Sequence, residues 1–112
     1  MTQKFIKNVD FASAFELAGQ VQYLDGQIVS KTLAQNDAVS LTLFAFEKGE
    51  EISAHESEGD AMVMALDGTG EITIAGEKFT LNAGQSIVMP SKTPHAILAL
   101  ERFKMFLIVV FP

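Results

Sequence analysis

The chain has 112 residues, no cysteine and a formal net charge of −6 at pH 7. Its length is typical of one domain, so we expect a single domain over residues 1–112, with an arm and a short helix over 1–20 and a β-barrel over 21–112. The lack of cysteine excludes thiolate catalysis and cysteine-ligated zinc. The acidic balance and the scattered basic residues predict no binding to nucleic acid or to an anionic membrane surface.

No stretch of the sequence predicts a secretory leader or a membrane span. The first residues, MTQKFIKNVDF, contain no apolar segment of the kind found in signal peptides. The longest apolar run, residues 105–111, is far shorter than the ~20 residues that a membrane-spanning helix needs. We therefore expect a cytoplasmic protein.

One short helix is predicted near the N-terminus, over residues 11–18. Asp10 is a favourable N-cap, and Phe11 and Phe15 are four residues apart, so they would share one face of a helix. Gly19 suits the position just after the last turn.

The rest of the sequence is typical of short β-strands separated by turns. The expected strands are residues 21–24, 28–34, 38–46, 61–66, 71–75, 78–81, 86–89, 95–100 and 103–111. The Asp-Gly pairs at 25–26 and 67–68 supply the positive φ that tight hairpin turns require. Turn signals recur about every eight to twelve residues, which predicts an all-β sandwich or barrel.

The C-terminal run, residues 103–111, is apolar at nearly every position instead of alternating. A strand that is apolar on both faces is covered on both sides. In a small barrel one face can point inward while a partner subunit covers the other. Together with nine phenylalanines in so short a chain, this predicts a homodimer.

The two histidines lie in separate loops that each adjoin β-type sequence, so we expect them to converge on one site. Strand side chains alternate, so residues 55 and 57 share a face, as do 61, 63 and 65, and 95, 97 and 99. If these faces point inward, they line a pocket of two imidazoles, one hydroxyl and small apolar groups. The candidate ligand-pocket residues are His55, Ser57, Ala61, Val63, His95 and Ile97, with Phe44 and Phe46 at the border.

Glycines, a proline and the histidines recur at defined spacings, namely Gly49, His55 and Gly68, and then Gly84, Pro90 and His95. This pattern resembles the two motifs of the cupin family of small jelly-roll barrels. The first motif runs Gly, five residues, His, one, His, three or four, Glu, six, Gly. The second runs Gly, five residues, Pro, one, Gly, two, His, three, Asn. The resemblance extends from about residue 44 to the C-terminus and implies an all-β jelly-roll barrel.

Four positions depart from the family's motifs. Ser57 stands where the second histidine is expected and Ala61 where the glutamate is expected, while Lys92 and Ala99 replace a glycine and an asparagine. In metal-binding cupins three histidines and that glutamate usually hold the ion. The resemblance therefore implies a divalent transition metal, Zn, Fe, Mn or Ni, as a candidate cofactor with only His55 and His95 as ligands.

Catalytic zinc or iron sites generally use three protein ligands. Candidates for the third are Glu56, Glu58 and Asp60, or the uncharged Gln22 and Gln35. Without a metal the two histidines are candidates for a general acid and base, with Asp60 or Glu58 orienting one of them. They are also candidates for a purely structural role, in which they satisfy hydrogen bonds at the barrel mouth.

Three functions follow as hypotheses. The first is a barrel that binds a small organic ligand, because alanine in place of glutamate leaves room for a mostly apolar molecule with one polar end. The second is a metal-dependent enzyme, a dioxygenase, isomerase or lyase acting on a small acid or sugar, as the resemblance implies. The third is a structural or interaction protein whose own side chains fill the barrel. Whether the protein is an enzyme stays open.

Overall fold

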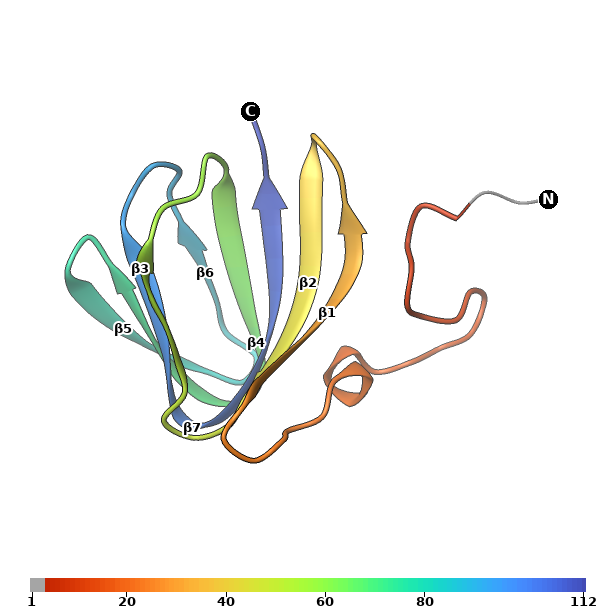
Figure 1. Ribbon diagram of the computed structural model, residues 1–112, viewed down its shortest axis with the longest axis horizontal. Coiled ribbons are helices and arrows are strands. Elements are labelled where there is room, and N and C mark those ends of the chain that lie inside the picture. The colour runs from red at the N-terminus through yellow and green to blue at the C-terminus, as the bar shows by residue number, and fades with distance from the viewer. Residues whose placement is uncertain (1–3) are drawn as a thin grey trace.

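The computed structural model describes residues 4–112, and nearly all of its regular secondary structure is antiparallel strand (Figure 1). The elements are η1 (Leu17–Gln20), a 3-10 helix, and strands β1 (Ile28–Gln35), β2 (Val39–Phe46), β3 (Glu51–His55), β4 (Asp60–Ile74), β5 (Glu77–Asn82), β6 (Ser86–Met89) and β7 (His95–Val110). The all-β prediction is confirmed. Across the described residues, no helix is long and apolar enough to cross a membrane.

Two long strands, β4 and β7, hold the barrel together because each of them pairs with three other strands of the one sheet. They pair with each other along most of their length. The C-terminal half of β7 also pairs with β2, and its N-terminal half pairs with β3. β4 pairs with β6 through its first half and with β5 through its second. Figure 1 shows the result, with β1 and β2 on one side of the barrel and β3 and β5 on the other.

The predicted hairpin turn at Asp67 and Gly68 is wrong, because β4 continues through both residues. Its pairing with β7 shifts register between Ala65 and Asp67 and again between Gly68 and Gly70. Gly68 has a φ of 73°. The positive φ therefore serves a bulge that bends the strand instead of a turn that ends it. The predicted strands 95–100 and 103–111 likewise join into the single strand β7. The predicted strand over residues 21–24 is wrong, since these residues form no strand.

A helix lies near the N-terminus as predicted, but it is a 3-10 helix of 4 residues that starts at Leu17. Residues 11–16 are not helical. Ala12 has a φ of 55°, which a right-handed helix excludes. Phe11 and Phe15 stay 49% and 45% exposed, so little burial stabilises a helical face here. Helices this short are marginal without such packing.

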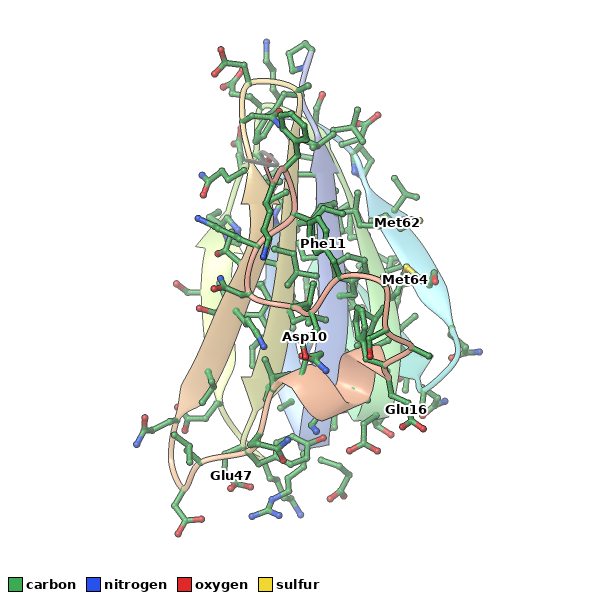
Figure 2. All side chains as sticks on the ribbon, turned by 90° about the vertical axis from the view of Figure 1, so that its right-hand side faces the viewer. Asp10, Phe11, Glu16, Glu47, Met62 and Met64 are labelled. Carbon is green, nitrogen blue, oxygen red and sulfur yellow. The ribbon has the colours of Figure 1, made fainter. Side chains whose placement is uncertain are left out.

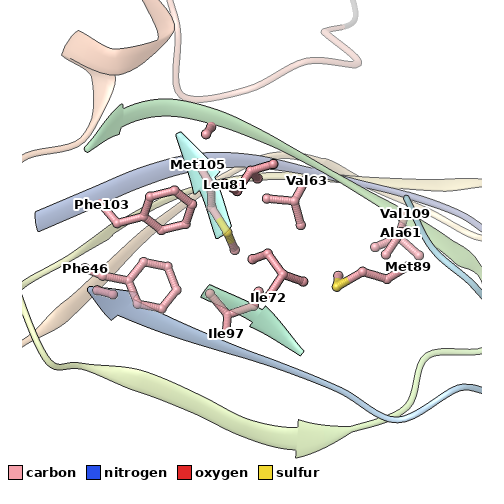
Figure 3. Packing of buried hydrophobic residues seen from close by; sticks show 12 residues of the cluster. Phe46, Ala61, Val63, Ile72, Leu81, Met89, Ile97, Phe103, Met105 and Val109 are labelled. Atoms are coloured by element: carbon pink, nitrogen blue, oxygen red, sulfur yellow. The ribbon is translucent and has the colours of Figure 1, made fainter. Parts of the chain in front are cut away.

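The barrel interior is packed with buried apolar side chains from β2, β4, β5, β6 and β7, and the partly buried Ile28 of β1 and Ile52 of β3 pack against them. The buried cluster consists of Phe46, Ala61, Val63, Ala65, Ile72, Leu81, Met89, Ile97, Ala99, Phe103, Met105 and Val109. Figure 3 shows Phe46 and Phe103 at one end of it and Ala61, Met89 and Val109 at the other. The two phenylalanine rings lie 5.9 Å apart. These two rings fill their end of the barrel, whereas the side chains at the other end are smaller.

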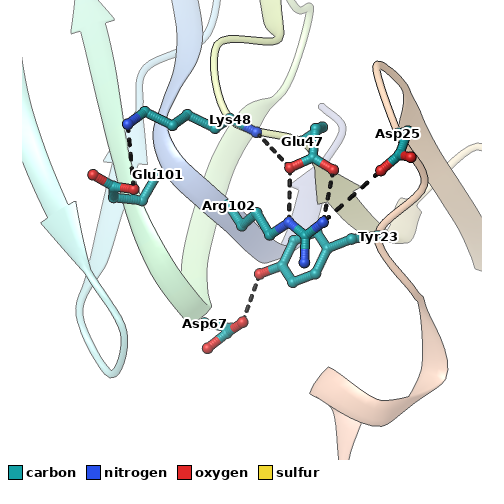
Figure 4. Close-up of polar contacts among 7 residues, drawn as sticks. All are labelled: Tyr23, Asp25, Glu47, Lys48, Asp67, Glu101 and Arg102. Carbon is teal, nitrogen blue, oxygen red and sulfur yellow. Dashed lines mark hydrogen bonds and ion pairs between the residues drawn. The ribbon is translucent and has the colours of Figure 1, made fainter.

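Polar contacts attach the segment before β1 to the barrel (Figure 4). The Tyr23 hydroxyl donates to Asp67 Oδ2 at 2.6 Å. Burial of the ring, and to a smaller extent this hydrogen bond, raises the pKa of Tyr23 well above its ordinary value. Arg102 donates two hydrogen bonds to the Glu47 carboxylate, at 2.7 and 3.1 Å, and lies over the Tyr23 ring. The buried Lys104 donates from Nζ to the main-chain carbonyl of Ala18, within η1, at 2.6 Å.

Candidate functional site

The two histidines meet across neighbouring strands, because His55 ends β3 and His95 begins β7 as its direct pairing partner. Their Nε2 atoms are 3.2 Å apart. The ring centroids are 4.4 Å apart with the planes at 74°. His95 is buried and His55 is exposed, so the pair lies at the boundary between the barrel interior and solvent.

Main-chain carbonyls hold the other nitrogen of each ring. His55 Nδ1 lies 3.0 Å from Ser53 O, and His95 Nδ1 lies 3.2 Å from Thr93 O. A carbonyl oxygen only accepts hydrogen bonds, so Nδ1 carries the hydrogen in both neutral rings. Both Nε2 atoms then face each other as acceptors, an arrangement that a shared proton, a donor group or a cation would stabilise.

The environment of His95 favours its neutral form. Burial of the ring, and then the nearby charge of His55, lower the pKa of His95 below its ordinary value. A neutral imidazole with its hydrogen on Nδ1 presents a lone pair at Nε2. The site therefore offers a hydrogen-bond donor or a cation an acceptor at the boundary of an apolar interior.

A cavity of about 280 Å³ opens beside the histidine pair. Its walls are mostly aliphatic, formed by Phe44, Ile52, His55, Glu56, Ser57, Ala61, Met89, His95, Ile97, Met105, Leu107 and Val109. The absence of a glutamate side chain at Ala61 leaves part of this space open. The cavity has one polar end and an apolar body.

Six of the eight predicted pocket residues line this cavity, namely Phe44, His55, Ser57, Ala61, His95 and Ile97. Val63 and Phe46 do not, and both lie fully buried in the core. They are deeper in the barrel, where Phe103 and Ile72 occupy the interior. Six lining residues were not predicted: Ile52, Glu56, Met89, Met105, Leu107 and Val109. Strand pairing would have found two of these, since Met89 and Val109 are the direct partners of Ala61.

The two motif loops are joined through positions that depart from the family's pattern. Lys92 replaces the second motif's glycine and has a φ of 55°, which a glycine would adopt with less strain. Its N–H donates to Ser57 O at 2.7 Å. Ser57 Oγ in turn accepts from the N–H of Gly59 at 3.2 Å. Ser57, which stands where the family's motif has its second histidine, is thus held close to His55 and His95.

In the described part of the chain no acidic side chain completes a three-ligand metal site with the two histidines. Within residues 4–112 no group of three His, Cys, Asp or Glu side chains could hold an ion. Asp60 instead accepts a hydrogen bond from the Ser91 N–H, and Glu58 faces Lys92 at 4.0 Å. The prediction that Asp60 or Glu58 orients a histidine is therefore wrong, since carbonyls occupy both Nδ1 atoms. His55 and His95 supply two donors only.

We expect His55→Ala to leave the fold intact. The ring is exposed and bonds only Ser53 O and His95, so its loss should change the free energy of unfolding by less than ~1 kcal/mol. Phe103→Ala, which empties the core, should instead cost about 3–5 kcal/mol. Thermal melts of both variants check this. A fall in Tm for His55→Ala that matches the Phe103→Ala fall would contradict it.

Comparison with known proteins places this fold and paired motif in a family. The model of the cupin domain matches residues 42–111, and the chain belongs to the cupin family. Among curated protein sequences none matches this chain significantly.

Several solved structures are similar over most of this chain. A conserved protein of unknown function from Streptococcus pyogenes is 42% identical with a TM-score of 0.97, over 100% of this chain and 98% of that one. A cupin superfamily protein from Desulfitobacterium hafniense is 33% identical with a TM-score of 0.91, over 96% and 98% of the two chains. A cupin 2 conserved barrel domain protein from Leptotrichia buccalis is 42% identical with a TM-score of 0.84, over 86% of this chain and 47% of that one.

Proposed function

We propose that the barrel binds a small organic molecule with an apolar body and one polar, oxygen-bearing end. The observation that carries this proposal is the cavity of about 280 Å³ beside two Nε2 atoms that lie 3.2 Å apart. The volume is near the lower end of the ~300–1,000 Å³ usual for ligand pockets, so the ligand is small. The cavity also argues against a barrel filled by its own side chains.

The residues that line the cavity indicate where the apolar body and the polar end of the ligand would lie. Met89, Met105 and Leu107 offer only dispersion contacts and burial to an apolar body. The histidine pair offers an acceptor to a hydroxyl group, or a shared proton to a carboxylate. A hydroxyl or carboxyl group on a short aliphatic or aromatic skeleton satisfies both ends.

Ligand-observed NMR with small alcohols, phenols and carboxylic acids tests the proposal. Ala61→Leu should weaken binding at least ~10-fold, because three added carbons enter the cavity and displace the ligand body. Ala83→Leu makes the same change on an exposed turn and should bind like the unmodified protein. His55→Ala should weaken ligands with a polar end more than purely apolar ones. Equal binding by Ala61→Leu and the unmodified protein would contradict the proposal.

A metal-dependent enzyme, such as a dioxygenase, isomerase or lyase on a small acid or sugar, is the second candidate. The observation in its favour is that both Nδ1 atoms are held by carbonyls, the arrangement usual for metal-ligating histidines. His55 and His95 would hold the ion, and the ligand or water would complete the coordination. A bound Zn, Fe, Mn or Ni ion would supply a Lewis acid that polarises a ligand oxygen.

Elemental analysis of protein purified without a chelating tag separates the two candidates. Near-stoichiometric metal that disappears in both His55→Ala and His95→Ala supports the enzyme. Metal-free protein that binds a small molecule supports the ligand-binding barrel. Metal-free protein that binds no small molecule supports the third hypothesis, a structural or interaction protein.

A further inference from the structure

The polar end of the cavity holds more hydrogen-bond acceptors than donors. Main-chain carbonyls hold the Nδ1 hydrogens of His55 and His95, so both Nε2 atoms can only accept while the rings are neutral. Among the lining side chains that the structure describes, the Ser57 hydroxyl is the one with a free hydrogen to donate. Its oxygen already accepts from the N–H of Gly59 at 3.2 Å, so that hydrogen remains for a ligand. Two acceptors therefore stand against one donor.

Glu56 adds a negative charge to this end of the cavity. It follows His55 in the chain and lines the same space, and it is the single acidic residue among the described lining residues, which include no lysine or arginine. Lys92 Nζ lies 4.0 Å from the Glu58 carboxylate instead. Across residues 4–112 no ion pair involves Glu56, so no cation in this range neutralises its carboxylate.

The surroundings of the cavity mouth have the same sign of charge. Glu58 and Asp60 follow Glu56 at alternate positions, and Asp60 directly precedes Ala61 of the lining. All three acidic residues are exposed, and the chain as a whole has a net charge of −6. An anionic ligand would therefore meet negative charge as it approaches the cavity and again when it is bound there.

Carboxylate and hydroxyl groups differ in how they fit this set of contacts. A carboxylate only accepts hydrogen bonds, so it would face the two Nε2 lone pairs and the charge of Glu56, with Ser57 as its described side-chain donor. A neutral hydroxyl donates to one Nε2 atom, accepts from Ser57 and carries no charge to be repelled. Because Glu56 is exposed, solvent weakens the repulsion, and we expect it to cost a carboxylate about 10-fold in affinity.

We propose that the cavity selects ligands whose polar end is a neutral hydroxyl, as in an alcohol or a phenol, and that Glu56 excludes carboxylates of the same skeleton. Discrimination of this kind uses a repulsive element against the wrong ligand as well as contacts to the right one. Glu56 is the repulsive element, while Ser57 and the histidine pair make the contacts. This selectivity rests on the proposed function, since it concerns the class of molecule that the barrel binds.

Ligand-observed NMR with pairs of an alcohol and a carboxylate on one skeleton tests the selectivity. Suitable pairs are benzyl alcohol with benzoate, n-hexanol with hexanoate, and cyclohexylmethanol with cyclohexanecarboxylate. The unmodified chain should bind each alcohol at least ~10-fold more tightly than its carboxylate. Glu56→Gln should reduce this ratio of affinities about 10-fold, mainly by tightening the carboxylate, and ~1 M NaCl should reduce the ratio for the unmodified chain. Desolvation of the carboxylate contributes to the ratio in both chains, so the difference between them measures the effect of Glu56.

Glu16→Gln is the matched control, because it removes the same charge from an exposed residue beside η1. Figure 2 shows Glu16 well away from Met62, which is the sequence neighbour of Ala61 in the lining. This variant should keep the ratio of the unmodified chain. Equal affinity for alcohol and carboxylate, as a proton shared by the two Nε2 atoms would give, or the same ratio in Glu56→Gln and Glu16→Gln, would overturn the selectivity and leave the proposed function intact. If no member of any pair binds, the proposed function fails and the selectivity fails with it.

Discussion

The double variant Ser57→His/Ala61→Glu is expected to bind a divalent transition metal with at least ~100-fold higher affinity than the unmodified chain, a gain of ~2.7 kcal/mol. Both positions line the same cavity as His55 and His95, and the change restores the four ligands of the family's motif. Affinity rises because ligand number increases from two to four and includes a carboxylate.

Calorimetric titration with Ni²⁺, Zn²⁺ and Mn²⁺ measures the gain. Without metal the variant should melt lower than the unmodified chain, because Ala61 is 2% exposed and glutamate there buries a carboxylate. Added metal should recover the loss. The control Ser57→Asn/Ala61→Gln has similar volume without the imidazole and the carboxylate. Equal affinities for the two variants would show that these positions do not converge on the histidine pair.

Gly68→Ala is expected to destabilise the fold by about 2–5 kcal/mol, which corresponds to a fall in Tm of ~8–20 °C. Two effects add. Gly68 has a φ of 73°, which costs an alanine ~1–2 kcal/mol. A Cβ there would also overlap the carbonyl oxygen of Arg102 on β7, and relieving such overlap typically costs ~1–3 kcal/mol.

Gly76→Ala is the matched control because it isolates the backbone conformation. Gly76 has a φ of 84°, and no atom lies within 4 Å of where a Cβ would stand. Its replacement should therefore cost only the ~1–2 kcal/mol of the strained φ. Thermal and urea melts of the two variants give the comparison. Equal losses would mean that the contact between β4 and β7 relaxes around the added carbon at no cost.

Several features of this protein can be predicted from its sequence alone. The paired spacings of Gly49, His55 and Gly68 and of Gly84, Pro90 and His95 were sufficient to predict the family and its barrel. The meeting of His55 with His95 followed from the same motifs. The glycine positions and the strand alternation are local features, because they act over a few residues, whereas His55 and His95 lie 40 residues apart and meet through the pairing of β3 with β7.

Other features depend on contacts between distant parts of the chain. Asp67 and Gly68 looked like a hairpin turn, but pairing of both sides with β7 makes them a bulge. Residues 11–16 looked helical, yet no packing there compensates for the cost of ordering a short helix. Val63 looked like a pocket residue, but the interior is already filled at its depth.

The sequence by itself therefore indicated the class of the barrel and that its two histidines share one site, because the spacing of glycines, prolines and histidines within strands and turns is a local property of the chain. The tertiary structure alone decided which nitrogens of His55 and His95 face each other, where the barrel stays hollow, and where the N-terminal arm lies beside Leu41 and Phe106. These features depend on how β3, β4 and β7, which are far apart in the sequence, pair with one another. They also depend on packing, because the volume of the side chains on one strand decides how much space remains beside the next strand.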